Sequence, residues 1–121
     1  MVDPTVVSSV QQYLRNLMQQ GIAARLGVVF GSYAKGKPDA WSDIDVLVVA
    51  PIFDGIVSRE TINHLWRVAA RTDSRIEPIP CGQIQWVEDV TSPIVEIARR
   101  EGVCVTCEDA DAIGQSDCPT V

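Results

Sequence analysis

Two short valine-rich runs, with a polar segment between them, restrict the folds open to this chain. Leu26–Phe30 and Ile44–Ala50 are each bounded by turn-forming residues and are typical of buried β-strands. The segment that joins them contains Gly36, Pro38 and Asp39, which favour a loop. We therefore expect two strands, linked as in a hairpin, within one small sheet.

Amphipathic spacing predicts three helices around these strands. Their apolar residues recur three and four positions apart, which places them on one face of a helix. Gly21 follows the first helix at the position where a left-handed residue commonly ends one. The first two helices span Thr5–Gln20 and Ser58–Arg71, and the third begins at Ser92 and ends at Gly102.

The same spacing predicts which side chains of the helices are buried. In the second helix, Trp66 belongs to the apolar stripe and is assigned to the core. In the third helix, the inner face consists of Ile94, Ile97 and Ala98. These faces are expected to pack on the sheet.

The rest of the chain supplies further strands. Arg75–Ile79 and Gln83–Val87 have a β-like composition and are separated by a turn or bulge at residues 80–82. Val103–Val105 can add an edge strand after the third helix. This order of elements predicts an α/β domain with a small mixed β-sheet flanked by helices.

Length and charge limit the classes of function. The 121 residues correspond to one domain, which we place at residues 1–107, followed by an acidic and flexible carboxyl tail at 108–121. Sixteen acidic and ten basic residues give a net charge of −6. This charge argues against direct nucleic-acid binding, which depends on neutralising phosphates.

The apolar runs are too short to cross a membrane. The longest, Val46–Phe53, has eight residues and contains a proline, whereas a membrane helix needs about 20. The amino-terminal segment carries Asp3 and no basic residue before Arg15, unlike a secretory signal. We expect a soluble, cytoplasmic protein without membrane contact.

The four cysteines allow two interpretations. Cys104 and Cys107 have the C-x-x-C spacing of a zinc knuckle. A tetrahedral cysteine site usually uses two such knuckles, whereas Cys81 and Cys118 stand alone. Reduced thiols, as expected in the cytosol, are the favoured interpretation.

Asp43 and Asp45 form a carboxylate pair at the start of the second strand. On a strand this spacing puts both on one face, about 7 Å apart at the backbone, while Ile44 points to the other. Two carboxylates beside a core strand need a compensating cation or proton. Magnesium commonly takes one or two carboxylates together with the oxygens of a nucleoside triphosphate. The alternative is that both acids lie at an exposed strand start.

Gly31 and Ser32 directly follow the first strand, with ten residues between Ser32 and Asp43. A glycine allows the backbone to approach a ligand, and the amides of a tight turn can bind phosphate oxygens. Ser32 adds a hydroxyl donor. We interpret this segment as a candidate phosphate site, with a plain strand-ending turn as the alternative.

Taken together, Gly31–Ser32, ten residues and Asp43–Ile44–Asp45 resemble the G-S-x10-D-x-D motif of the nucleotidyltransferase superfamily that includes DNA polymerase beta. The segment GSYAKGKPDAWSDIDVLVV also resembles the minimal nucleotidyltransferases, which are stand-alone catalytic domains. The similarity covers residues 5–106. It implies a single nucleotidyltransferase-type domain that uses ATP and two magnesium ions.

The resemblance also implies the nucleotide-binding residues. Gly31 and Ser32 would hold the triphosphate. Lys35 stands where the family often has arginine. A lysine offers the phosphates one point charge in place of a two-pronged contact.

Three carboxylates would bind the metal and take part in catalysis. Asp43 and Asp45 would bind the two magnesium ions, and a later strand would supply the third carboxylate. Glu77 is the first candidate for this third position, although minimal members often have aspartate there, and Glu88 is the fallback.

Finally, the resemblance implies a partner. Minimal members are commonly paired with a small helical HEPN protein in toxin–antitoxin modules, and the implied reaction is transfer of AMP from ATP to a tyrosine of the HEPN toxin. The chain would then be the antitoxin. A partner or a second copy of the chain would complete the acceptor site. The alternatives are a nucleotide-binding antitoxin without turnover and transfer to a small molecule such as an aminoglycoside.

Overall fold

The computed structural model describes residues 4–24, 26–30, 43–88 and 92–106 of the chain. Within these ranges, four strands form one sheet in the order β3-β2-β1-β4. β1 runs antiparallel to both β2 and β4, whereas β2 and β3 are parallel. The predicted α/β class with a small mixed sheet is confirmed. The strands are β1 (Leu26–Phe30), β2 (Ile44–Val49), β3 (Ile76–Cys81) and β4 (Val103–Thr106).

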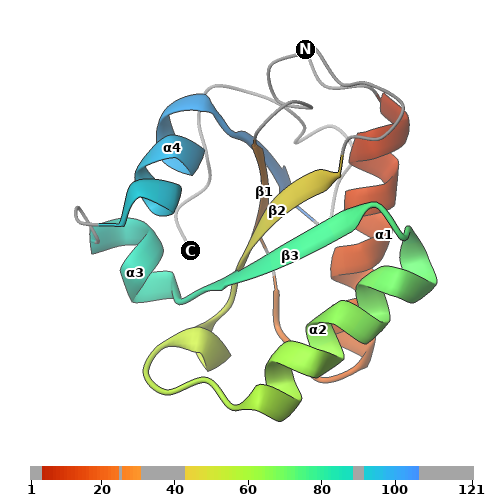
Figure 1. The fold of residues 1–121 in the computed structure, drawn as a ribbon, viewed down its shortest axis with the longest axis horizontal. Coiled ribbons are helices and arrows are strands. Elements are labelled where there is room, and N and C mark those ends of the chain that lie inside the picture. The colour runs from red at the N-terminus through yellow and green to blue at the C-terminus, as the bar shows by residue number, and fades with distance from the viewer. Residues whose placement is uncertain (1–3, 25, 31–42, 89–91, 107–121) are drawn as a thin grey trace.

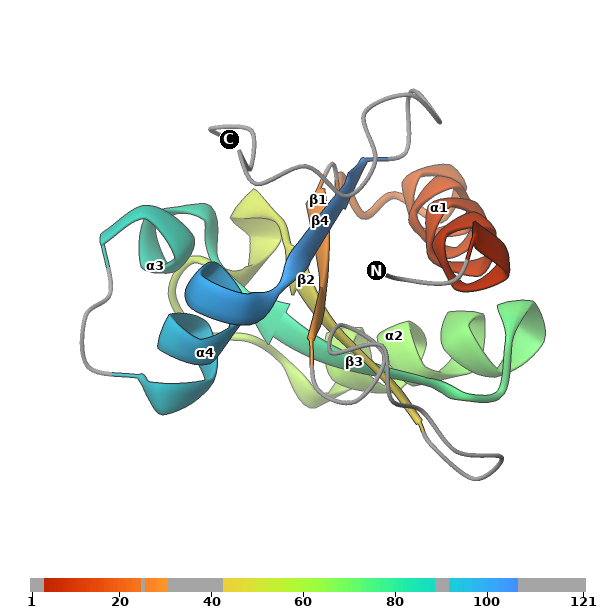
Figure 2. The same cartoon turned by 90° about the horizontal axis from the view of Figure 1, so that it is seen from above.

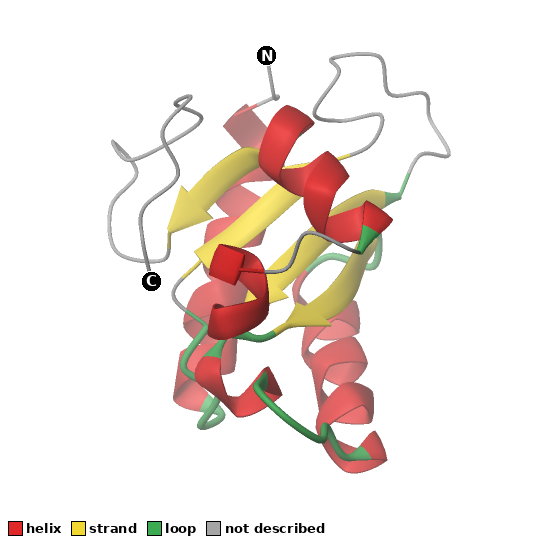
Figure 3. Ribbon diagram, turned by 90° about the vertical axis from the view of Figure 1, so that its left-hand side faces the viewer, coloured by secondary structure: helices red, strands yellow, loops and turns green. Residues whose placement is uncertain are grey.

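Helices cover both faces of the sheet. The helices α1 (Pro4–Gln19) and α2 (Arg59–Thr72) lie on one face, and α3 (Gln83–Glu88) and α4 (Pro93–Glu101) lie on the other (Figures 1 and 2). Figure 3 looks onto the sheet from the side of α3 and α4. A short 3₁₀ helix, η1 (Pro51–Phe53), follows β2. The predicted acidic tail, residues 108–121, lies outside the described residues.

The strands of the sheet divide their side chains between two apolar clusters. In β2, Ile44, Val46 and Val48 pack into the cluster that contains α1 and α2. Leu47 and Val49 pack into the second cluster with residues of α3 and α4. This alternation follows from the two-residue period of a strand, so that successive β2 side chains point to opposite faces of the sheet.

The predicted end of the first helix is confirmed. Gly21 has a φ of +88°, and the N–H of Ile22 donates to the carbonyl of Leu17 at 2.9 Å. The N–H of Gly21 donates to the carbonyl of Met18 at 3.1 Å. These two bonds and the left-handed glycine define a Schellman cap.

The strand β3 extends further than predicted. We expected a turn or bulge at residues 80–82, but Pro80 and Cys81 belong to β3 and pair with Val48 and Val49. Proline cannot donate to a ladder and is therefore confined to edge strands or strand starts. β3 is the edge of this sheet, so both Pro78 and Pro80 are tolerated.

The prediction of a strand at Gln83–Val87 is wrong, because these residues form α3. Asp54 accepts the N–H of Ile84 at 3.0 Å. The Arg99 guanidinium donates to the carbonyls of Gln85 and Trp86 and lies 5.7 Å from the Trp86 ring centroid. Distant residues therefore satisfy both ends of this short helix, and they outweigh its β-like composition.

The buried faces of α2 and α4 are rotated from the predicted ones. Trp66 is 46% exposed, whereas its neighbour Leu65 is fully buried. In α4, Ile94 is 43% exposed and Val95 and Ala98 are buried. The assignments of Trp66 and Ile94 to the core are wrong, and that of Ala98 is confirmed.

Gly102 ends α4, as predicted, and is followed by β4, which forms the other edge of the sheet. Its φ of −75° would suit any residue. A Cβ at this position, however, would lie 2.3 Å from the Ala98 carbonyl oxygen and 2.3 Å from Cγ1 of Val28. Glycine is therefore required here for the close approach of α4 to β1.

The prediction of reduced thiols is wrong at Cys104, which is disulfide-bonded. Cys81 is a buried thiol that donates to the carbonyl of Gly82. In the part of the chain that the structure describes, no helix is long and apolar enough to cross a membrane.

Asp73 joins the end of α2 to the start of β3. Its carboxylate accepts hydrogen bonds from the Arg75 backbone N–H at 3.0 Å, from Nε at 3.1 Å and from the terminal nitrogen at 2.8 Å. These bonds, the side-chain ones first, lower the pKa of Asp73 from 3.8 to about 2. The carboxylate therefore stabilises the turn that places β3 beside β2.

We predict that Asp73→Asn lowers the free energy of unfolding at pH 7 by about 1–2 kcal/mol. Because the pKa is lower in the folded state, the contribution is complete above 3.8 and is lost as the pH falls toward 2. The difference between variant and wild type in urea unfolding should therefore shrink over that interval. Glu96→Gln, which alters an exposed ion pair with an N–O distance of 3.7 Å, is the control. A difference that persists at pH 2 would contradict the assignment.

Candidate active site

Two aspartates lie at the start of β2. Asp43 is exposed and directly precedes the strand, and Asp45 is its half-buried second residue. Ile44, between them, is fully buried against the α1 and α2 face. Strand alternation puts Asp45 on the same face as Leu47, the side covered by α4.

Glu77 lies directly beside this pair. It is the second residue of β3, and the parallel register aligns it with Asp45. The side chains of Asp43 and Asp45 lie near enough to the Glu77 carboxyl group to raise its pKa. The fold therefore brings together three acidic groups from two neighbouring strands.

The environment raises the pKa of two of these acids. Burial is the largest cause at Asp45, where the charge of Asp43 adds to it and the hydrogen bond from Glu77 opposes it. Burial also comes first at Glu77, followed by the charge of Asp43 and the hydrogen bonds to both aspartates. Two carboxyl groups can share a hydrogen bond only if one holds a proton, so the group attracts a proton or a cation.

The donor chemistry of this group suits a hard cation. Carboxylate oxygens are the ligands that magnesium takes, usually one or two from the protein, with the remainder from water or phosphate. Among the described residues, no group of three or more His, Cys, Asp or Glu side chains is arranged to hold a metal ion. Asp43 and Asp45 supply carboxylate oxygens, which is the ligand type that magnesium takes.

The predicted nucleotide-binding residues Gly31, Ser32 and Lys35 lie outside the described residues. The structure does describe Phe30, the residue before Gly31. Phe30 ends β1 and is paired with Asp45 on β2. The chain thus passes next to the carboxylates immediately before the glycine and serine of the motif.

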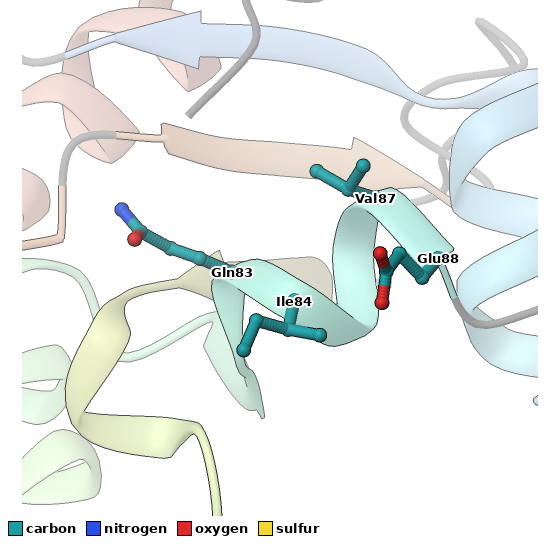
Figure 4. Close-up of a pocket in the computed structure, with 4 residues that line it drawn as sticks. All are labelled: Gln83, Ile84, Val87 and Glu88. Atoms are coloured by element: carbon teal, nitrogen blue, oxygen red, sulfur yellow. The ribbon is translucent and has the colours of Figure 1, made fainter.

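Glu88, the fallback for the third carboxylate, lies elsewhere in the fold. It is an exposed residue at the end of α3, and this helix follows the carboxyl end of β3, whereas Glu77 lies near its start. With Gln83, Ile84 and Val87 it lines a pocket of about 230 Å³ (Figure 4). The structure brings Glu77, and not Glu88, to the aspartate pair.

Sequence reasoning missed the position of Phe30 beside the acids. A strand register depends on which strands become neighbours, and a single sequence does not show it. The one signal in the sequence was its place in the chain, as the last strand residue before Gly31–Ser32.

Comparison with known families identifies the domain. The model of the nucleotidyltransferase domain family matches residues 14–101, which include both aspartates and Glu77. The chain belongs to the nucleotidyltransferase domain family. One similar solved structure is described as the crystal structure of a toxin–antitoxin with AMP-PNP. It matches with a TM-score of 0.55 and 20% sequence identity over 84% of this chain and 77% of that chain. No curated protein matches the chain.

Proposed function

We propose that this nucleotidyltransferase is a minimal family member that transfers AMP from ATP to a protein hydroxyl, and that it acts as the antitoxin of a toxin–antitoxin pair. The observation that carries this proposal is the meeting of Asp43, Asp45 and Glu77 at one end of two parallel strands. The similar fold of a toxin–antitoxin structure with AMP-PNP supports an adenine nucleotide and a protein partner. A tyrosine of a helical HEPN toxin is the proposed acceptor.

The three acids would have different roles in the reaction. Asp43 and Asp45 would hold magnesium, which when bound neutralises phosphate charge and favours in-line displacement. Glu77 would accept the proton of the acceptor hydroxyl, because the register of β2 and β3 places this carboxyl group beside Asp45. Gly31 and Ser32 would hold the triphosphate and Lys35 would add one positive charge.

The bond changes define the products. The acceptor oxygen forms a bond with the α-phosphorus of ATP, and the bond from this phosphorus to the bridging oxygen of the β-phosphate breaks. Pyrophosphate leaves with the electrons of that bond, and the hydroxyl proton passes to Glu77. Most of the catalytic effect would come from positioning and charge compensation.

The experiment is a transfer assay with the purified chain, magnesium and a HEPN partner. Label from α-phosphate-labelled ATP is expected on the partner, whereas label from γ-phosphate-labelled ATP is not. EDTA should abolish transfer, and replacement of the acceptor tyrosine by phenylalanine should remove the labelled site. Transfer of the γ-label would show phosphoryl transfer and contradict the proposal. Neutralisation of the toxin without any labelling would instead favour a non-catalytic antitoxin.

A further inference from the structure

One row of side chains crosses three strands beside the carboxylates. The register pairs Phe30 of β1 with Asp45 of β2, and Asp45 with Glu77 of β3. Side chains paired in this way lie on the same face of the sheet, with Cβ atoms roughly 5 Å apart. An aromatic ring is therefore the direct neighbour of the central acid, on the side away from Glu77.

The Phe30 side chain packs against the apolar core on one side and is partly exposed to solvent. Phe30 is half-buried and packs against the apolar cluster beneath α3 and α4, as does Ile79, two residues after Glu77. On its other side, β4 begins at Val103, which pairs with Val29, and the preceding residue is Gly102. Phe30 is not fully covered by its neighbours, so it keeps some exposed surface in the row that contains Asp45.

The opposite face of the sheet is closed to a ligand. The helices α1 and α2 cover it (Figure 2), and Ile44 and Ile76, which directly precede Asp45 and Glu77, are buried there. Because Asp45 and Phe30 are paired and share a face, a nucleotide whose phosphates lie at Asp45 lies on the face that carries Phe30. β1 also leads directly from Phe30 into Gly31 and Ser32.

We propose that Phe30 contacts the base of the bound nucleoside triphosphate by stacking. This inference rests on the proposed function, because it assumes that the carboxylates receive a nucleotide. The acids can recognise the phosphates and the cation but not the base, whereas an aromatic ring offers any base a complementary π-face. Phe30 is thus a specificity residue for nucleosides over bare polyphosphate, with little preference among bases.

The test compares ATP with inorganic tripolyphosphate as ligands in titration calorimetry with magnesium. Phe30→Ala is expected to weaken ATP binding about tenfold and to change tripolyphosphate binding by less than about twofold. Phe30→Leu, which keeps most of the buried volume, should lie between wild type and Phe30→Ala for ATP. Each Phe30 variant should bind GTP more weakly than wild type by about the same factor as it does ATP. Trp66→Ala, which removes a half-exposed aromatic ring on α2, should change neither ligand.

The outcomes separate this inference from the proposed function. If both Phe30 variants bind ATP as tightly as wild type, or lose ATP and tripolyphosphate equally, Phe30 does not contact the base and the nucleotide site stands without it. If wild type binds neither ligand, the proposed function fails and the inference fails with it. Urea unfolding of each variant shows whether loss of binding reflects loss of folding.

Discussion

Asp45→Asn is expected to reduce AMP transfer by a factor on the order of 10³ and, at the same time, to raise the free energy of unfolding. The amide has nearly the shape of the carboxylate and still offers an oxygen to Glu77. It removes the charge that would hold a cation at the α-phosphate. It also removes a partly buried negative charge that Asp43 repels. Activity and stability should therefore change in opposite directions.

The gain in stability should depend on pH. The pKa of Asp45 is raised in the folded state from the usual 3.8, so the ionised group costs folding free energy at neutral pH. Below about pH 3.8 both folded and unfolded chains are protonated, and the difference between wild type and Asp45→Asn should vanish. Urea unfolding at pH 7 and pH 3 measures this change.

The control for Asp45→Asn is Asp54→Asn, the same chemical change near the opposite end of β2. Asp54 directly follows η1, and its carboxylate accepts the N–H of Ile84 at the start of α3. Its replacement should leave the rate of transfer within about twofold of wild type. Transfer by Asp45→Asn at a tenth of the wild-type rate or more would contradict a direct role in the reaction. A fall in its free energy of unfolding would assign Asp45 a structural role.

The aspartate pair shows what local pattern can predict. Two acids separated by one buried apolar residue on a strand must share a face, because side chains alternate with a period of two. The structure places Asp45 and Ile44 on opposite faces, as the sequence predicts. The caps at Gly21 and Ser58 are predictable for the same reason, because they involve only residues within one turn of the helix end.

The position of Glu77 could be proposed from the sequence, but local pattern alone does not determine it. Its place beside Asp45 depends on the parallel register of β2 and β3, two strands that are separated in the chain by α2. The same limit explains the error at α3. Its fold depends on Asp54 and Arg99, which are 30 and 13–14 residues away from the groups they bond.

Glu77→Gln is expected to lower kcat for AMP transfer by about 10²–10³, the usual contribution of a general base. Glutamine keeps the length and the hydrogen-bonding oxygen but cannot take the acceptor proton. Because Glu77 would act on the acceptor, the KM for ATP should change by less than about threefold. Wild-type kcat should fall on the acid side as Glu77 becomes protonated. In Glu77→Gln this fall should be absent from the pH profile.

Glu88→Gln provides the matched control, because it is the same exchange in the other glutamate that the sequence offers as third carboxylate. Glu88 lies at the end of α3, beyond the carboxyl end of β3, and is exposed. Its replacement should leave both kcat and the pH profile unchanged. If Glu88→Gln lost activity and Glu77→Gln did not, Glu77 would not be the proton acceptor, although it is aligned with Asp45. The combination of a lost acid limb and a retained KM is specific to Glu77 as the proton acceptor, since a merely structural residue would alter both kinetic constants and the free energy of unfolding together.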